Sequence, residues 1–410
     1  MTAPLRPDLE TSTPSTRGPH ELPVRFSSSP YATAKPRARR RPRRGLVIGV
    51  LGGAAVIAAL GITQLTANLG YDAAADRFAD TLRTATAVTS ETAHTRDVLA
   101  RATDAGHVIR DAGSAPIAVP EDIVSALSTA IAEGEEVGAA AEKLLATALP
   151  SPGTKPIWFW ELFGASSELV EDESSLDDLV QDLETASESA VEAEDAVQES
   201  GLAVLSSAGE SAAAFEAAHP SARNDAVIAL RNAAADALAA TTIDDDAATT
   251  YVALQDAGAQ VVATESEEMA EKSGPLRGAR LEIEAFARSL APGVLLEFDW
   301  SPVVNGAGYN GSMGGYTTWW WDDPGRAHIE LSDSVAEQWP AERSKALVAH
   351  EVGHAISVKC EDMYDASTQD SIEKWATAWA ISMGYTDDAN GVWAYGYPPQ
   401  EYVDAAAGCR

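Results

Sequence analysis

Hydrophobic and polar positions follow three different patterns along this chain. Between residues 71 and 273, alanine, leucine and valine recur at three- and four-residue spacing, as in Ile123, Leu127 and Ile131. That spacing predicts amphipathic helices. After Gly274-Pro275 the apolar residues gather into short runs that are typical of β-strands. The third pattern is a continuous uncharged stretch that begins at Gly45.

Proline, glycine and polar loop signals divide the region 71–273 into separate helices. The expected helices cover residues 73–111, 120–149, 175–199, 202–218, 220–241 and 247–272. An aromatic segment, Ile157 to Phe163, interrupts this region. Either its rings fill the core of the helical bundle, or they form an exposed patch for a protein partner or the outer membrane leaflet.

The pattern after residue 274 predicts a compact domain over residues 274–410. Strands are expected at 294–300, 315–321 and 327–331, and helices at 341–359 and 371–383. The expected fold class is therefore α+β, with an α-helical bundle or stalk in front of the mixed domain. The glycine-rich segments Asn305 to Gly308 and Gly314-Gly315 predict turns, because no helix start follows them as a phosphate-binding loop requires.

The uncharged stretch from Gly45 to Thr63, continued to Ala67, has about the length of a transmembrane helix. The basic block Arg37 to Arg44 directly precedes it. Because such charge stays in the cytoplasm, we expect a disordered cytoplasmic tail (1–44), a transmembrane helix (45–67) and an extracellular remainder. A cleaved signal peptide is an alternative with a shorter apolar core. A buried core helix is another, but the arginine block disfavours it.

The chain is acidic, with 29 Lys and Arg against 62 Asp and Glu and a net charge of −33. A body of this charge repels phosphate backbones, so nucleic-acid binding is not expected. The two cysteines, Cys360 and Cys409, would be free thiols in a reducing compartment and a disulfide in an oxidising one. Predicted export favours the disulfide, which would hold the C-terminal tail against the rest of the domain 274–410.

The strongest chemical signal is the sequence His350-Glu351-Val352-Gly353-His354. Two histidines four residues apart lie on one helix face, so both can bind one zinc ion, Zn²⁺. Glu351 can then act as general base toward metal-activated water. Apolar flanking residues predict a buried helix, which disfavours a histidine pair without a metal. Gly353 costs about 1 kcal/mol relative to alanine, and predicts close backbone packing.

A third ligand must come from elsewhere, because the extended motif with a third histidine is absent. His328 is the only other histidine after residue 274. Glu373 begins a run with helical spacing and small residues near its own face, so it is the preferred carboxylate ligand. Asp370, one turn earlier, and Glu361 are the alternatives.

With the histidine motif and the pattern Glu373, Ala376, Trp379, Ala380, the chain resembles the zincin metallopeptidases of the gluzincin type. The resemblance covers roughly residues 290–385 and rests on these two motifs. It implies a zincin-like domain with His350, His354 and Glu373 as zinc ligands and Glu351 as base. It also implies that the segment 328–332 is an edge strand that pairs with a bound peptide.

Oxyanion stabilisation in such a site has three candidates, Tyr385, Tyr395 and Tyr397. The run Trp319 to Trp321 is interpreted as strand packing, with substrate contact as the alternative. The leading hypothesis is a membrane-anchored extracellular zinc peptidase that acts on protein or peptide, with peptidoglycan left open. Its helical region would act as a spacer, as a sensor or as a binding surface for a protein partner. The alternative is a helical surface-binding protein with a silent zincin-like domain, which the presence of Glu351 disfavours.

Overall fold

The computed structural model describes residues 44–304 and 314–410. Two compact units divide the chain, Met1–Leu65 and Thr66–Arg410, and each is described by itself. The expected disordered tail lies outside the described residues except for Arg44, as does the expected turn at residues 305–308. The domain boundary expected at residue 274 stays a prediction.

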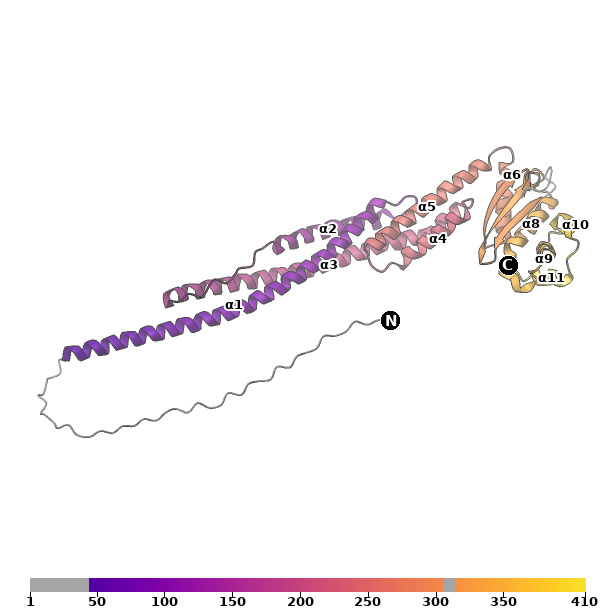
Figure 1. Ribbon diagram of the computed structural model, residues 1–410. Helices are drawn as coiled ribbons and strands as arrows, with labels where there is room; N and C mark the ends of the chain where they lie inside the picture. Colours follow the sequence, from indigo (N-terminus) through magenta and orange to yellow (C-terminus); the bar gives the residue numbers. More distant parts are fainter. Residues whose placement is uncertain (1–43, 305–313) are drawn as a thin grey trace, which may run out of the picture. The chain divides into compact units, whose positions relative to one another are not determined.

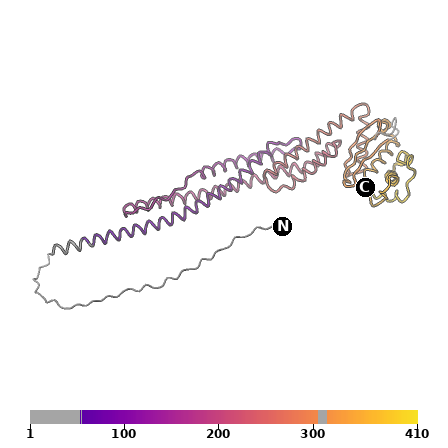
Figure 2. The backbone as a smooth tube through the Cα atoms, viewed as in Figure 1, coloured from indigo at the N-terminus to yellow at the C-terminus, as the bar shows by residue number. Residues whose placement is uncertain are grey.

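The described chain begins with a series of long helices that ends at Glu271 (Figures 1 and 2). They are α1 (Arg44–Ala112), α2 (Glu121–Leu145), α3 (Phe159–Ala218), α4 (Asn224–Ala239) and α5 (Asp245–Glu271). The helices expected at 175–199 and 202–218 are one continuous helix, α3. Gly201, the expected break, lies inside this helix. A Cβ at this position would stand only 2.6 Å from Ile243 Cγ1, so the packing of Ile243 favours glycine there.

A seven-residue repeat, which the sequence analysis missed, organises the first part of α3. Its buried residues recur in steps of seven: Leu162, Leu169, Leu176, Leu183, Ala190 and Val197. This is the period of a coiled-coil seam. The seam packs against α1, where Thr92 donates a hydrogen bond to the carbonyl of Leu183 at 3.1 Å. Small residues such as Ala74 and Ala85 on α1 allow this close approach.

The expected membrane span is wrong. Residues 45–67 form part of α1, and no helix among residues 44–304 and 314–410 joins the length and hydropathy needed to cross a bilayer. The stretch from Gly45 to Thr63 contains five glycines and four alanines, whose small side chains carry little apolar area. The expected single-pass localisation, with a cytoplasmic N-terminus and an extracellular C-terminal domain, depended on this span and is therefore wrong as well.

The aromatic segment before and within the start of α3 is mainly exposed, against the expectation that it fills the bundle core. Ile157, Trp158, Trp160 and Phe163 are each at least half exposed, and only Leu162 is fully buried. The rings of Trp158 and Trp160 stack on each other at 5.2 Å. Spacing explains the outcome, because only Leu162 falls on the seven-residue seam.

The elements after α5 build a small sheet and the helices that pack on it. They are α6 (Arg277–Leu290), β1 (Leu295–Ser301), β2 (Gly315–Trp320), β3 (Asp323–Ser332), α7 (Asp333–Glu337), α8 (Glu342–Ser357), η2 (Val358–Met363), α9 (Gln369–Ser382), η3 (Asp388–Asn390), α10 (Val392–Tyr395) and α11 (Gln400–Ala406). The expected α+β class is wrong for the described chain, which is mainly helical with one three-stranded sheet. The predicted strand runs are correct, but the long helices of residues 44–271 outweigh them.

The sheet has the strand order β1-β3-β2, with β1 parallel and β2 antiparallel to β3. The segment His328 to Ser332 therefore lies in the central strand, β3, and not in the expected edge strand. Both sides of β3 are already hydrogen-bonded to neighbours. Strand β2 lies at an edge of this sheet and contacts α8.

Helix α8 lies between the sheet and α9 (Figure 1). Its residues from Val348 to Ser357 are all buried. On α9, Trp375 and Trp379 are fully buried in the same core. A disulfide joins Cys360, in η2, to Cys409, with a Cα–Cα distance of 6.0 Å. The predicted disulfide is confirmed, and Trp379 Nε1 donates a hydrogen bond to the Cys409 carbonyl at 2.9 Å.

Candidate metal centre

Three side chains from α8 and α9 meet at one point. The Oε2 atom of Glu373 lies 3.3 Å from Nε2 of His350 and 3.1 Å from Nε2 of His354. The two histidines are nearly completely buried, and Glu373 is about one-eighth exposed. The alignment follows from helix geometry, since His350 and His354 stand one turn apart on α8. The structure thus brings together the three residues that the sequence analysis chose as ligands.

The spacing of the ligand atoms fits a tetrahedral zinc ion. Ligand atoms about 2.0–2.2 Å from zinc lie about 3.4 Å apart at tetrahedral angles. The two nitrogen–oxygen distances of 3.1 and 3.3 Å are close to that value. Two imidazoles and one carboxylate also form a donor set found in zinc sites that keep a position for substrate. The residues present therefore fit the metal.

The close approach of α8 and α9 depends on Gly353. A Cβ at this position would lie 2.8 Å from the carbonyl oxygen of Ala376 and 3.0 Å from its Cα. Both of these are backbone atoms, so no side chain could move aside. Only glycine lets the two helices approach closely enough to join their ligands, and the packing role predicted for Gly353 agrees with this contact.

Neighbouring groups orient His350 and Glu373. Thr377 donates a hydrogen bond to the carbonyl of Glu373 at 2.8 Å, and its Oγ1 lies 3.4 Å from Nδ1 of His350. A lone pair of Thr377 Oγ1 can therefore accept from Nδ1–H, which leaves Nε2 of His350 free to bind a metal. Gln369 donates to Oε1 of Glu373 at 2.9 Å, so Oε2 faces the histidines. Burial raises the pKa of Glu373, but its hydrogen bonds to both histidines outweigh that effect and hold the pKa well below the usual range.

Packing from two sides fixes the imidazole rings. Trp319 of β2 stacks on His354 with ring centroids 5.2 Å apart and planes within 5°. Nδ1 of His354 is buried and has no hydrogen-bond partner among the described residues, so this ring is held by stacking. Gly391, at φ 102°, passes so close to His350 that a Cβ would stand 2.7 Å from the ring. Trp319 therefore packs behind a ligand, which the sequence interpretation as simple strand packing did not include.

Glu351 stands beside the three ligand residues and is held by strand β2. Its Oε2 accepts a hydrogen bond from Thr317 Oγ1 at 2.7 Å. A Cβ on Gly315 would stand 2.7 Å from the carboxylate, so the strand backbone closes over it. Burial raises the pKa of Glu351, while the nearby His350 and the hydrogen bond from Thr317 oppose that rise. A carboxylate whose pKa is raised toward neutrality suits proton transfer.

Of the three candidate tyrosines, only Tyr395 lies at the site. Its ring stacks over His350 at 6.0 Å. Burial raises its pKa to about 12, and the carboxylates of Glu373 and Glu351 act in the same direction, so its hydroxyl remains a proton donor. Tyr385 instead packs edge-on against Phe286, and Tyr397 is 76% exposed.

The alternative ligands do not join the cluster. Asp370 forms an ion pair with Lys374 at 2.7 Å on the outer face of α9. Glu361 is exposed in η2. His328 pairs with Asp299 across β1 and β3 at 3.0 Å, so it is not available as a third histidine.

A cleft of about 560 Å³ opens beside His350 and Glu351. It is lined by the start of β2, by α7 and the first turns of α8, and by the segment 388–395. Leu347, Trp393 and Tyr395 contribute apolar surface to its walls. Its size is that of a pocket for a small molecule or a few peptide residues.

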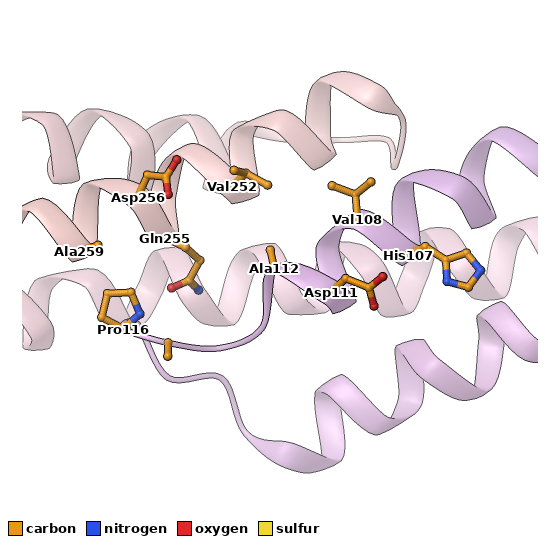
Figure 3. Close-up of a pocket in the computed structure, with 10 residues that line it drawn as sticks. His107, Val108, Asp111, Ala112, Pro116, Val252, Gln255, Asp256 and Ala259 are labelled. Atoms are coloured by element: carbon orange, nitrogen blue, oxygen red, sulfur yellow. The ribbon is translucent and has the colours of Figure 1, made fainter.

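A second hollow, of about 480 Å³, lies in the helical region between the end of α1 and α5 (Figure 3). Two of its polar side chains already have partners. Gln255 bonds to both backbone groups of Ile117, and His107 bonds to Glu135 at 2.8 Å. The hollow brings together no set of groups with catalytic spacing, so the cleft beside α8 is the candidate site.

Comparison with known proteins adds no assignment. No family model matches the chain, and neither the curated proteins nor the solved structures contain a match. The similarity to zincins therefore rests on the two sequence motifs alone.

Several residues of the site escaped the sequence analysis. Thr377 was detectable in principle, because it lies four residues after Glu373 and so on the same helix face. Thr317, Gly315 and Gly391 were not, because each depends on a tertiary contact made from a distant part of the chain. Their residue types carry no chemical signal by themselves.

Proposed function

We propose that this protein is a zinc-dependent hydrolase, and specifically a metallopeptidase of gluzincin type. The observation that carries the proposal is the meeting of Glu373 Oε2 with Nε2 of both His350 and His354 at 3.1–3.3 Å. When bound there, zinc would supply Lewis acidity that polarises a carbonyl and lowers the pKa of water toward neutrality.

The residues around the ligands support a division of roles. The Glu351 carboxylate accepts a hydrogen bond from Thr317 and is not one of the three proposed ligands. It therefore remains able to accept a proton from the attacking water and to pass it to the leaving amine. Tyr395 keeps its proton at neutral pH and faces the cleft, so its hydroxyl can donate to a developing oxyanion. The cleft then holds the substrate chain, protein or peptide, beside both groups.

The test is the zinc content of the full chain, measured by elemental analysis beside three variants. We expect about one zinc per chain in the wild type. His354→Ala should abolish binding, and Glu373→Gln should weaken it. Asp370→Asn, the matched control on the same helix, should bind zinc like the wild type. If the folded wild-type chain takes up no zinc, the proposal is refuted.

Activity forms the second arm of the test. Zinc-loaded protein should cleave unfolded casein, and a chelator should abolish the cleavage. Glu351→Gln should retain zinc but lose cleavage by a factor of at least about 10². If Glu351→Gln were as active as the wild type, Glu351 would not be the base.

A second function has one specific observation in its favour. The exposed side chains Ile157, Trp158, Trp160 and Phe163 form an apolar surface of the kind used to bind a protein partner. In this alternative the helical region binds and the zincin-like site is silent. Zinc uptake without any chelator-sensitive cleavage would favour it over the peptidase.

A further inference from the structure

The cleft beside α8 contains one cationic side chain, Arg343. It lies seven residues before His350, two helical turns toward the start of α8, and so on the same helix face. Seven residues correspond to about 10 Å along the helix axis. Leu347 lies between the two positions, and all three residues line the cleft. Arg343 therefore stands at one end of a stripe that leads to the metal ligands.

The guanidinium of Arg343 has no charge partner in the described part of the chain. It forms no ion pair or hydrogen bond there, whereas the neighbouring Glu342 and Lys345 bond to each other at 2.8 Å. The acidic residues that line the cleft are Glu351, bound to Thr317, and Asp388, which forms no ion pair with Arg343.

The internal segment outside the described residues, 305–313, adds no acidic residue near the start of β2 in the sequence. Residues 305–313 read Asn-Gly-Ala-Gly-Tyr-Asn-Gly-Ser-Met and contain no ionisable acid or base apart from the tyrosine. They directly precede Gly314, which lines the cleft. Whatever their position, they bring no carboxylate that could neutralise Arg343.

We propose that Arg343 selects substrates that carry a carboxylate on the side of the scissile bond directed toward the first turn of α8. This inference rests on the proposed hydrolase function. An extended peptide rises about 3.3 Å per residue, so 10 Å corresponds to about three residues from the metal. The reach of the arginine side chain shortens this to two or three residues. A guanidinium binds a carboxylate through two parallel hydrogen bonds, which a neutral amide cannot reproduce.

The carboxylate has two possible sources, an Asp or Glu side chain or the C-terminus of a short peptide. Both present the same group to Arg343. The apolar residues beside it, Leu347 and Trp393, would contact the side chain between the carboxylate and the scissile bond. The substrate class is thus an acidic peptide or the end of a peptide chain.

Binding of short peptides that carry a zinc-binding hydroxamate tests the proposal without relying on turnover. The probes are tripeptides with a succinyl hydroxamate at the N-terminus, and a second series with a C-terminal hydroxamate. Each series contains matched pairs of peptides that differ only in having Asp or Asn at one position. The first series also contains pairs that differ only in having a free carboxylate or an amide at the C-terminus. Affinities are measured on the zinc-loaded full chain and on Arg343 variants.

We expect the wild type to bind the matching carboxylate probe about tenfold more tightly than its amide partner. Arg343→Gln should remove this preference and Arg343→Lys should keep part of it, while Arg343→Glu should reverse it in favour of the amide. Arg277→Gln, at an exposed arginine outside the cleft, and Asp388→Asn, at an acidic residue that lines it, should both retain the preference. Whether the Asp pair or the terminal pair shows the preference identifies the source of the carboxylate.

Equal affinity of the wild type for the carboxylate and amide members of every pair would overturn the role of Arg343 and leave the zinc hydrolase intact. A preference that survives in Arg343→Gln would also overturn it. If no hydroxamate binds to the zinc-loaded chain, the proposed function itself fails, and this inference fails with it. Since Arg343 is exposed, its variants should fold like the wild type, which their zinc content checks.

Discussion

Replacing Gly353 by alanine should destabilise the protein, although alanine is the better helix former. In an exposed helix the change would stabilise by about 1 kcal/mol. At Gly353 the new methyl group would stand 2.8 and 3.0 Å from backbone atoms of Ala376. Carbon atoms pack best at about 3.5–4.0 Å, so α8 and α9 must separate by about 0.5–1 Å. Such overpacking costs about 1–3 kcal/mol. After the helix-propensity gain is subtracted, we therefore expect a net loss of up to about 2 kcal/mol.

The same displacement should weaken zinc binding, because the ligands belong to the two helices that separate. Ligand distances in a good site hold to within about 0.2 Å, which is less than the expected shift. Urea unfolding followed by tryptophan fluorescence measures the stability, because Trp375 and Trp379 are buried at this contact. Competition with a fluorescent chelator measures the zinc affinity.

Gly138 provides the matched control for Gly353. It lies within α2, and a Cβ there would meet no atom within 4 Å. Gly138→Ala should therefore stabilise the protein by up to about 1 kcal/mol through helix propensity and leave zinc affinity unchanged. If Gly353→Ala stabilised the chain as much as Gly138→Ala, the argument from close helix packing would be refuted.

Three further predictions concern the site and its support. Thr377→Val should lower zinc affinity about tenfold with little effect on folding, since it removes the hydroxyl beside a ligand imidazole; unchanged affinity would exclude that orienting role. Cys409→Ser removes the disulfide to Cys360, whose sequence separation is 49, and should lower the free energy of unfolding in urea by about 4 kcal/mol. A reductant should destabilise the wild type by the same amount and leave the variant unchanged. The His328–Asp299 hydrogen bond raises the pKa of His328 and lowers that of Asp299. The histidine's contribution is therefore fully present below pH 6.5 and is lost as pH rises through its higher folded pKa. His328→Gln should thus be less stable than the wild type near pH 6 and approach it near pH 9, and a difference that grows with pH would contradict this sign.

The sequence was sufficient to select the residues that the structure brings together at the candidate site, because their signal is local. His350, Glu351 and His354 belong to one helical turn, and Glu373 begins a second helix with recognisable spacing. Tyr395 could not be distinguished from Tyr385 and Tyr397, since that choice depends on how the segment after α9 returns to His350. The contacts of Thr317 and Gly391 likewise depend on tertiary structure.

The fold was less accessible from the sequence for two physical reasons. Strand order is a property of long-range pairing, so the position of β3 at the centre of the sheet could not be deduced from its residues. In the helical region, frequent alanines masked the seven-residue seam of α3, because small residues give a weak periodic signal on every face.

The bridge between Cys360 and Cys409 also determines what a broken backbone would do to the site. The covalent loop that it closes contains the proposed third ligand, Glu373, together with Gly391 and Tyr395. A single cut anywhere in that loop leaves both pieces attached to one another through the sulfur atoms. Under the proposed peptidase function, the connecting segments would be exposed to attack by neighbouring copies. The bridge means that one such nick between α9 and the tail does not release the ligand helix from the rest of the molecule.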